Sequence, residues 1–339
     1  MSIVNLEPAI ACPLYGRDLL STLPPELVEG PVIFTQPEPW EMVSTAFPQD
    51  SVSVHFVTGM EHDEARRIAD SVGPVSAVFG IGGGSALDQA KFTAWRRGLP
   101  LVLAPLILSV DAAFTKAAGV REGRRVRYVG DVIPDRLLID FALLQRAPPV
   151  LNRAGASDVL SIFTALWDWR EAAGRGEVFE EGIAAQAAGL LERLYAGAAE
   201  LREVTDAGLR LLSELFVGEV RLCEMVGSSR PEEGSEHYLA YCIEKTTERS
   251  YIHGQLVGLC IDVVGRLQGQ DIGPVRRFLG GLELDCRLAE VGLSQEELRA
   301  SLLAMPGYLA GEPQLLPGIF HFRGALPRAE VEELVAGTA

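Results

Sequence analysis

The sequence FGIGGGSALDQAK, from Phe79 to Lys91, places three consecutive glycines between an apolar run and an amphipathic stretch. The apolar run predicts a β-strand, Gly82 to Gly84 predict a turn, and the residues that follow predict a helix. Ser85 is expected to cap that helix, because Ser85 and Asp88 have the spacing of a capping box. Glycines at a helix start leave backbone N–H groups open to an anion. The stretch therefore predicts either a phosphate-binding loop or a tight strand-to-helix turn.

The glycine pattern departs from the usual dinucleotide fingerprint of the Rossmann fold. That fingerprint ends in glycine or alanine and is followed, about 20 residues on, by an acidic residue that holds a ribose. Here the run from Gly80 to Ser85 ends in serine, and no acidic residue occurs between Asp88 and Asp111. The loop by itself indicates a phosphate and leaves the rest of the ligand open.

Short apolar runs alternate with helical patterns up to about residue 145. Helical stretches such as HDEARRIADSV lie between several of the runs, and strands separated by helices form βαβ units with a mainly parallel sheet. We therefore expect a Rossmann-like α/β domain with strands at 31–36, 51–59, 75–84, 99–106 and 136–140.

The character of the sequence changes after Pro148 and Pro149. From Ala184 to Val226, apolar residues recur at every third or fourth position, which predicts two long helices, and the rest of the chain continues in this way. We expect two domains: a nucleotide-binding α/β domain at 1–148, and an all-helical domain at 149–339 that binds a metal and the substrate.

The composition excludes some classes of partner. A formal net charge of −16 argues against nucleic acid, because a polyanion is bound by a basic face. The five cysteines form no CxxC pair, so they indicate buried thiols of a reducing compartment rather than a zinc ribbon or a disulfide framework. The chain start lacks the pattern of a secretory signal, and no charge-free apolar run reaches about 18 residues. We therefore expect a cytoplasmic protein without an integral membrane segment.

Three residues of the helical half could bind a metal: Asp158 in NRAGASDVLSIFTALWDW, His237 in GSEHYLAYCIEK and His253 in YIHGQLVGLCIDVVG. Each is expected at the start of an amphipathic helix. The structural alternatives are a helix-capping aspartate and two histidines satisfied by backbone carbonyls. If the three side chains converge, two nitrogens and one oxygen form a metal site of the catalytic type, with an open coordination position.

Five motifs occur in a characteristic order: GIGGGSALDQAK, PLILSVDAAF, NRAGASDVLSIFTALWDW, GSEHYLAYCIEK and HGQLVGLC. In this order the chain resembles the superfamily that unites dehydroquinate synthases, iron-containing alcohol dehydrogenases and glycerol dehydrogenases. The nearest branch by these motifs is that of the sn-glycerol-1-phosphate dehydrogenases, whose AGxxD and DW motifs are similar to residues 154–158 and 168–169. The similarity extends over about residues 75 to 265 and implies a dehydroquinate synthase-like fold.

The resemblance implies roles for individual residues. Asp158, His237 and His253 fall on the family's metal-ligand positions, for Zn²⁺ or for another divalent ion such as Fe²⁺ or Ni²⁺. Ser109 falls where a serine helps to position the cofactor, and Asp111 falls where an aspartate faces the substrate. Together with the ligands, Asp111 completes the implied catalytic set. The loop implied to hold the pyrophosphate of NAD or NADP consists of Gly82, Gly83, Gly84 and Ser85, and Asp88 completes its motif.

Three positions depart from the family patterns. Leu106 stands where the family has threonine, and Ala112 stands where it has glycine, so one expected cofactor contact is missing. Tyr241 stands where the cyclases of the superfamily have a second histidine that handles protons. The tyrosine therefore favours plain hydride transfer over the elimination and aldol closure that a sugar phosphate cyclase performs.

These features lead to one expected activity. We expect a metal-dependent, NAD(P)-linked oxidoreductase that acts on a small phosphorylated polyol or ketone, with sn-glycerol 1-phosphate and dihydroxyacetone phosphate as the first choice. Two alternatives stay open: a sugar phosphate cyclase that uses catalytic NAD and a metal, and a non-catalytic paralogue that only binds a ligand. We also expect the chain to form a homo-oligomer and to bind a small phosphorylated molecule as its substrate.

Overall fold

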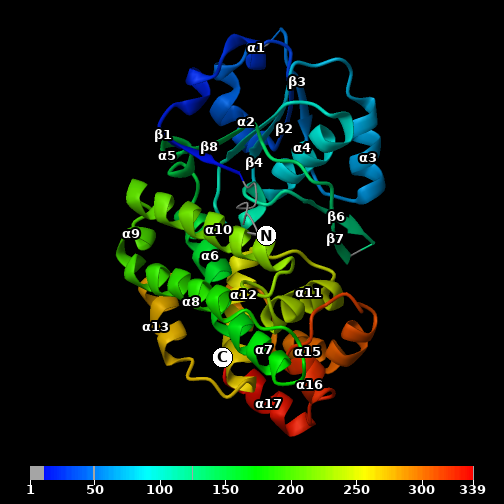
Figure 1. Cartoon of the computed structure of the whole chain (residues 1–339), viewed down its shortest axis with the longest axis vertical. Coiled ribbons are helices and arrows are strands. Elements are labelled where there is room, and N and C mark those ends of the chain that lie inside the picture. Colours follow the sequence, from blue (N-terminus) through cyan, green and yellow to red (C-terminus); the bar gives the residue numbers. More distant parts are fainter. Residues whose placement is uncertain (1–10, 49, 124, 339) are drawn as a thin grey trace, which may run out of the picture. The chain divides into compact units, whose positions relative to one another are not determined.

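The first half of the chain forms a six-stranded parallel sheet (Figure 1). The structure, a computed structural model, describes residues 11–48, 50–123 and 125–338. The strand order is β1-β8-β5-β4-β2-β3. This sheet confirms the predicted α/β class. Its strands are β1 (Pro13–Gly16), β2 (Val32–Thr35), β3 (Ser53–Phe56), β4 (Val78–Gly82), β5 (Leu101–Pro105) and β8 (Arg136–Asp140).

Each of the five predicted strand ranges contains one of these strands. Strands β2, β4 and β5 are buried throughout and read as continuous apolar runs, whereas β3 is partly exposed. Strand β1 was not predicted, and neither was the antiparallel hairpin of β6 (Ala118–Glu122) and β7 (Arg125–Val129). The sequence of β1, PLYG, is short and contains proline and glycine. That of β7, RVRYV, carries two arginines and lies partly exposed, so neither segment shows the apolar run of a central strand.

The two faces of strand β4 pack against different partners. Phe79 and Ile81 belong to an apolar core with Val43 of helix α2 (Pro37–Val43). On the opposite face lies Gly80, where a Cβ atom would come within 2.8 Å of Ala90 Cβ in helix α4 (Gly84–Arg97). Because side chains alternate across a strand, glycine at this position lets α4 approach the sheet closely.

Helix α4 begins two residues earlier than the prediction of Ser85 as its N-cap implies. Its N-cap residue is Gly83, which forms no side-chain cap, and Ser85 is already the second helical residue. The predicted capping box of Ser85 and Asp88 is therefore wrong. The Asp88 carboxylate instead lies 2.9 Å from the ammonium nitrogen of Lys91, and the Gly83 N–H is bonded to the side chain of Gln36. The Asp88 carboxylate, which the capping box would have joined to the Ser85 N–H, thus pairs with Lys91.

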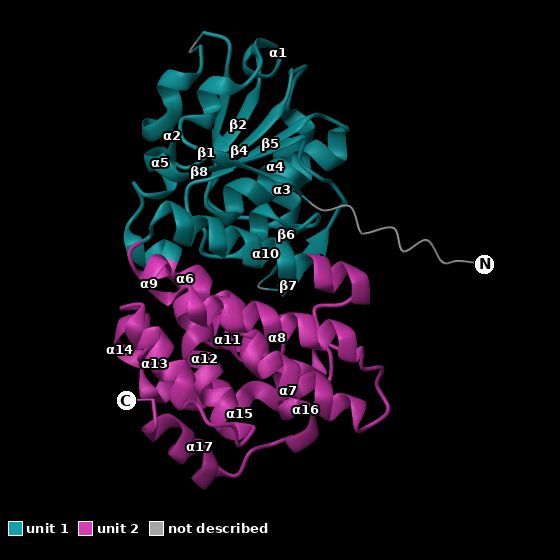
Figure 2. Ribbon diagram, turned by 60° about the vertical axis from the view of Figure 1, so that its left-hand side comes forward, with its two compact units in different colours: residues 1–152, 204–220 teal, residues 153–203, 221–339 magenta. Residues whose placement is uncertain are grey.

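The chain divides into two compact units, coloured separately in Figure 2. Unit 1 comprises residues 1–152 and 204–220, and unit 2 comprises residues 153–203 and 221–339. The division differs from the expected domains at 1–148 and 149–339, because residues 204–220, which include the larger part of helix α10 (Asp206–Val226), group with the α/β half. Tyr15 and Arg17, which flank the end of β1, hydrogen-bond to Ser213 and Asp206 within this unit.

The remaining helices of unit 1 are short connections around the sheet. The described helices that lie wholly within this unit, apart from α2 and α4, are α1 (Pro25–Val28), α3 (His62–Ser71) and α5 (Phe141–Leu144), with single 3₁₀ turns at Leu19–Thr22, Ser44–Ala46 and Asp111–Ala113.

Unit 2 is helical throughout its described residues. Helix α6 (Pro149–Leu160) leads into it, and α12 (His253–Leu267) is its most completely buried helix. The other helices that lie wholly within the described part of this unit are α7 (Ile162–Ala173), α8 (Glu181–Ala196), α9 (Ala198–Arg202), α11 (Ser235–Thr247), α13 (Gly273–Gly281), α14 (Leu288–Val291), α15 (Gln295–Ala310), α16 (Ile319–Arg323) and α17 (Arg328–Ala336).

Two further expectations concern the whole chain. In the described residues, no helix is long and apolar enough to cross a membrane. The five cysteines are free, but only Cys242 and Cys260 are buried, and Cys12 is exposed. The expectation of uniformly buried thiols was therefore wrong. The predicted absence of a signal sequence concerns in part residues 1–10, which lie outside the described residues.

Candidate metal centre and nucleotide loop

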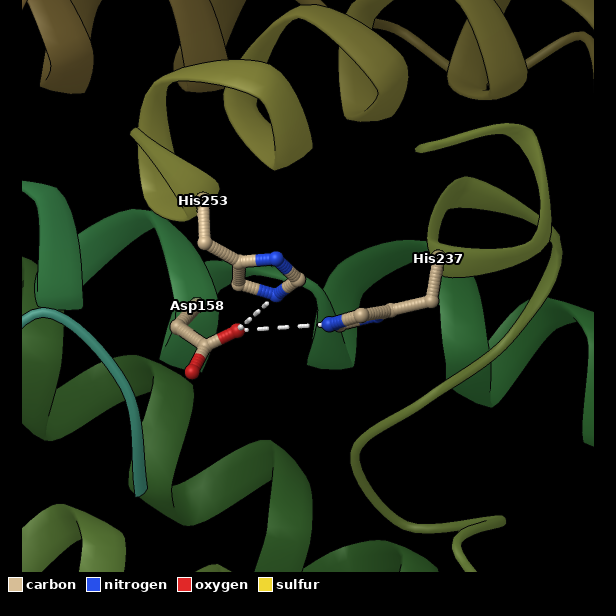
Figure 3. Close-up of side chains that lie close together, drawn as sticks. All are labelled: Asp158, His237 and His253. Carbon is tan, nitrogen blue, oxygen red and sulfur yellow. Dashed lines mark hydrogen bonds and ion pairs between the residues drawn. The ribbon is translucent and has the colours of Figure 1, made fainter. Parts of the chain in front are cut away.

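Three helices of unit 2 bring Asp158, His237 and His253 together (Figure 3). The Nε2 atom of His237 lies 3.2 Å from Asp158 Oδ1, and the Nε2 atom of His253 lies 3.5 Å from the same oxygen. One ligand atom from each side chain falls within 4.8 Å of the others. Three segments that are far apart in the sequence thus supply the set that the motifs indicated.

The helical settings of these residues differ in part from the prediction. His253 is the first residue of α12, and His237 is the third residue of α11. Asp158, however, lies near the end of α6, which begins at Pro149 because proline fits the first turn of a helix. The expectation that Asp158 starts or caps a helix was wrong, and its carboxylate contacts the two imidazoles instead.

The electrostatics of the cluster suit a cation. Asp158 is only 9% exposed, and its ion-pair partners among the described residues are the two histidines. Burial raises the pKa of Asp158, but hydrogen bonds from His237 and His253 outweigh burial and hold that pKa below its ordinary value. One buried carboxylate and two imidazoles form a donor set that Zn²⁺ and related divalent ions accept, so these residues fit a metal.

Glu236 is a buried carboxylate beside this cluster that the sequence analysis missed. Its Oε1 atom lies 2.9 Å from His237 Nδ1 and accepts the Gly234 N–H at 2.6 Å. Its Oε2 atom lies 2.7 Å from the Thr164 hydroxyl. The motif GSEH showed the residue beside its histidine, but an acidic residue in the first turn of a helix ordinarily reads as solvent-exposed.

A second buried carboxylate, Asp168 of α7, anchors the backbone around the cluster. It accepts the Ser235 N–H at 2.8 Å, the Ile319 N–H at 2.9 Å and the Gln268 side-chain amide at 3.0 Å. Burial raises the pKa of Asp168 to about 6, against the opposing effect of its hydrogen bond with Ser235. The DW motif thus contributes a carboxylate that fixes the start of α11, the helix that carries His237.

Tyr241 lies one helical turn beyond His237. Its ring centroid is 6.0 Å from that of His237 and 6.5 Å from that of His253, and it stacks on the latter at an interplanar angle of 27°. The residue that replaces the cyclase histidine therefore lies against both imidazoles of the cluster.

The glycine turn belongs to unit 1 and follows strand β4. Its glycines meet different constraints, because Gly82 has φ +138°, a value that other residues rarely adopt, whereas Gly83 has extended backbone. A Cβ atom added at Gly83 would lie 3.3 Å from Ile107 Cδ1, and no other atom would come closer than 3.4 Å. At Gly84 the nearest atom would be 3.6 Å away. The fold requires glycine at 82, whereas 83 and 84 have room for a side chain.

The turn lies where the strand order reverses. From β2 the chain proceeds to β3 on one side, and from β4 it proceeds to β5 and β8 on the other side. Ligands of open α/β sheets bind beyond the carboxyl ends of the strands at such a switch point. The residue that follows β2 there is Gln36, whose Oε1 accepts the Gly83 N–H at 3.3 Å and whose Nε2 lies 3.4 Å from Ser85 Oγ.

The other predicted cofactor and substrate residues also belong to unit 1. Ser109 and Asp111 follow β5, and both are partly buried. Leu106, in place of the expected threonine, is 3% exposed and donates its N–H to the Gly82 carbonyl. The Asp88 carboxylate, by contrast, already forms an ion pair with the ammonium group of Lys91. The structure brings Gly82 to Ser85 together at the switch point and gives Asp88 a partner of its own.

Comparison with known proteins agrees with this arrangement. The family described as iron-containing alcohol dehydrogenase matches residues 35–148. Glycerol-1-phosphate dehydrogenase [NAD(P)+] from Methanothermobacter thermautotrophicus is 27% identical over 76% of this chain, and the enzyme of the same name from Hyperthermus butylicus is 33% identical over 67% of it. The alignments span 73% and 65% of those two relatives.

The solved structures extend the similarity to the whole fold. A probable glycerol dehydrogenase from Sinorhizobium meliloti 1021 matches with a TM-score of 0.71 and 19% identity, over 97% of this chain and 98% of that chain. The fold is thus shared by the nearly complete chain, while the curated relatives share its sequence over about three quarters or less. The chain belongs to the iron-containing alcohol dehydrogenase superfamily, near its glycerol-1-phosphate dehydrogenase branch.

Proposed function

We propose that this chain is a metal-dependent, NAD(P)-linked dehydrogenase of a small phosphorylated polyol, with sn-glycerol 1-phosphate and dihydroxyacetone phosphate as its substrate pair. The observation that carries the proposal is the convergence of Asp158, His237 and His253 around one carboxylate oxygen. The names of the curated relatives support the choice of substrate, since both describe glycerol-1-phosphate dehydrogenases.

The three side chains are the residues that would hold the metal. A divalent cation bound there supplies Lewis-acid polarisation of a substrate carbonyl, and a nicotinamide supplies or accepts the hydride. Asp158 contributes a full negative charge, because its contacts with the two imidazoles keep it ionised. A set of three protein ligands is the type found in catalytic metal sites rather than in closed structural ones.

The chain's other residues shape and hold this site. Asp168 and Glu236 fix the start of α11, so His237 is presented by a rigid backbone. Tyr241 packs against both imidazoles and limits the space on its side of the cluster. We assign Asp111 to the substrate, as the family motif implies, and the turn at Gly82, Gly83, Gly84 and Ser85, with Ser109, to the cofactor.

Several finer points belong to the same proposal. We propose Zn²⁺ as the metal, with Fe²⁺ or Ni²⁺ as the alternatives, and either NAD or NADP as the cofactor. Gln36 places a neutral side chain beside the glycine turn, which leaves both cofactors admissible. We further propose a cytoplasmic homo-oligomer that binds no nucleic acid.

Two assays on metal-replete protein test the reaction. In the first, oxidation of NADH and NADPH is followed by absorbance with dihydroxyacetone phosphate, and the product is checked for the configuration of sn-glycerol 1-phosphate. In the second, a phosphorylated heptulose is incubated with catalytic NAD and the products are analysed. Reduction of dihydroxyacetone phosphate is expected. A cyclised product without net cofactor turnover would assign the chain to the cyclases, and inertness in both assays would contradict the proposed substrate.

A further inference from the structure

Glu236 is placed to control which nitrogen of His237 faces the metal. Its side chain is fully buried, and both of its oxygens have partners: Gly234 and His237 at Oε1, and Thr164 at Oε2. A carboxylate that is buried at such cost persists only where its hydrogen bonds are made. The contacts therefore fix the position of Glu236 on the His237 ring.

The chemistry of imidazole turns this position into a constraint. A neutral imidazole has one N–H and one lone pair, and the nitrogen that carries the proton is set by the partner of the other nitrogen. Both oxygens of Glu236 accept hydrogen bonds, Oε1 from the Gly234 N–H and Oε2 from the Thr164 hydroxyl, so the contact with His237 requires the N–H at Nδ1. With the proton on Nδ1, a cation bound to the cluster would be held by the lone pair of Nε2, the atom that lies 3.2 Å from Asp158 Oδ1.

Without a cation, a hydrogen bond from His237 to the Asp158 carboxylate requires a proton on Nε2 as well, and a bound cation would take the place of that proton. Carboxylates that accept the second N–H of a metal-binding histidine are known to orient the ring and to raise its basicity. His253 lacks this arrangement: the ion pair found for it among the described residues is through Nε2 to Asp158, and its side chain is 27% exposed. The two histidines are thus held differently.

The turn before α11 holds Glu236 itself in place. A Cβ atom at Gly234 would lie 2.9 Å from Asp168 Oδ2 and 3.2 Å from Glu236 Oε2, so this glycine allows both carboxylates to approach the backbone. Asp168 accepts the next N–H, that of Ser235. The start of α11 is therefore clamped by two buried carboxylates, one of which touches a metal ligand.

We propose that Glu236 is a positioning residue that holds His237 with its proton on Nδ1 and its Nε2 lone pair directed at the metal. The inference rests on the proposed function only for the presence of a cation on Asp158, His237 and His253, and not for the substrate. It predicts that the negative charge and the reach of Glu236 strengthen metal binding without contact with the metal.

The test compares zinc affinities by competition with a chromogenic chelator. Glu236→Gln retains the shape but removes the charge, and Glu236→Asp retains the charge but shortens the reach. Each is expected to weaken zinc binding by about 10–100-fold, as loss of an outer partner does. The matched control is Thr164→Val, which removes the partner of Oε2 and leaves the contact between Oε1 and His237. It should change zinc affinity by less than about threefold, a small fraction of the loss of an outer partner.

A measurement on the wild-type chain covers the case in which a Glu236 variant does not fold. Nitrogen-15 NMR of the zinc-loaded protein, with the His237 signal assigned by its loss in His237→Gln, should show the metal on Nε2 and the proton on Nδ1. Zinc on Nδ1, or wild-type affinity in both Glu236 variants, would overturn the role of Glu236. Wild-type protein that binds no zinc would overturn both this inference and the proposed function. Zinc binding without reduction of any phosphorylated ketone would overturn the proposed reaction alone.

Discussion

The metal cluster and the glycine turn are built in opposite ways. The cluster consists of side chains that engage one another: Asp158 Oδ1 contacts both imidazoles, and both oxygens of Glu236 have partners. The turn consists of backbone, and at Gly83 and Gly84 it leaves space that a side chain could occupy. The metal site therefore depends on the side-chain atoms that contact one another, whereas the glycine turn depends on the absence of side chains beside its backbone.

This difference predicts different responses to substitution. In the cluster, a change removes a ligand or leaves a buried charge without its partner, and both effects are large. At the turn, a change adds atoms where the fold tolerates them, so the folded protein should survive while a ligand is displaced. A substitution in the cluster with no effect on metal binding or stability, or one at the turn that unfolds the protein, would contradict this expectation.

The largest effect is expected for His253→Ala. The change removes one of three ligands, so metal affinity should fall by more than the ~100-fold that loss of an outer partner costs. The fold should persist, because the side chain lies at the first residue of α12 and is 27% exposed. Metal content after gel filtration and thermal unfolding check the two statements.

A matched control is available for this substitution. His62→Ala removes a partly exposed histidine that pairs with Glu122 in unit 1. It should leave metal content at the wild-type level. Equal metal content in wild type and His253→Ala would show that the cluster is not a metal site. The contrast between the cluster and the turn would then no longer hold.

Asp88→Asn tests whether a residue of the glycine motif acts structurally. Asp88 pairs with Lys91, whose side chain is fully buried, and removal of one partner of a buried pair costs about 3–5 kcal/mol. The control is Asp70→Asn, whose partner Arg96 lies on the surface, so that loss of this pair should change stability far less than loss of the pair of Asp88 and Lys91. Urea unfolding of both variants, with cofactor affinity measured by calorimetry, separates the roles. Reduced cofactor affinity at unchanged stability would show that Asp88 contributes to cofactor binding rather than to the fold.

Much of the fold could be predicted from the sequence, because the central strands are buried on both faces and read as apolar runs. The hairpin at Ala118–Glu122 and Arg125–Val129 could not, since neither short strand is a continuous apolar run, and the second is partly exposed and carries two arginines. The convergence of Asp158 with His237, 79 positions away, depends on helix packing that spacing alone does not show. The resemblance to a family supplied it. The burial of Glu236 lay outside both kinds of argument.

The pH dependence of stability tests the second buried carboxylate. The pKa of Asp168 is about 6 in the folded chain and 3.8 ordinarily, so the folded state binds this proton more tightly. The protonated form of Asp168 stabilises the fold relative to the ionised form, and this stabilisation is fully present below about pH 4 and is lost as the pH rises through about 6. At about 1.4 kcal/mol per pH unit, the change is on the order of 3 kcal/mol.

The measurement for Asp168 uses metal-free protein, so that metal binding adds no pH dependence of its own. The free energy of unfolding in urea is compared between wild type and Asp168→Asn at several pH values from 4 to 7. The wild-type advantage should shrink as the pH rises. A constant difference between the two proteins would mean that Asp168 is ionised throughout, and that its three hydrogen bonds outweigh its burial.

The smallest expected effect sharpens the other side of the comparison. Gly83 has a backbone conformation that valine also adopts, and a Cβ atom there meets only the flexible end of Ile107, at 3.3 Å. Gly83→Val should therefore leave stability within about 1 kcal/mol of wild type, the usual cost of mild overpacking. A pyrophosphate seated on the backbone of this turn would be displaced, which should weaken NAD(H) or NADP(H) binding on the order of 10–100-fold, or about 1.4–2.7 kcal/mol.

The control for Gly83→Val is Gly59→Val, which adds the same side chain at a glycine of unit 1 with no atom within 4 Å of the new Cβ. It should change neither stability nor cofactor affinity appreciably. Calorimetric titration of both variants with each cofactor decides the matter. Wild-type affinity in Gly83→Val would mean that the cofactor does not approach this backbone. In that case the three glycines serve only the turn itself, in which Gly82, with φ +138°, is the residue that the fold requires to be glycine.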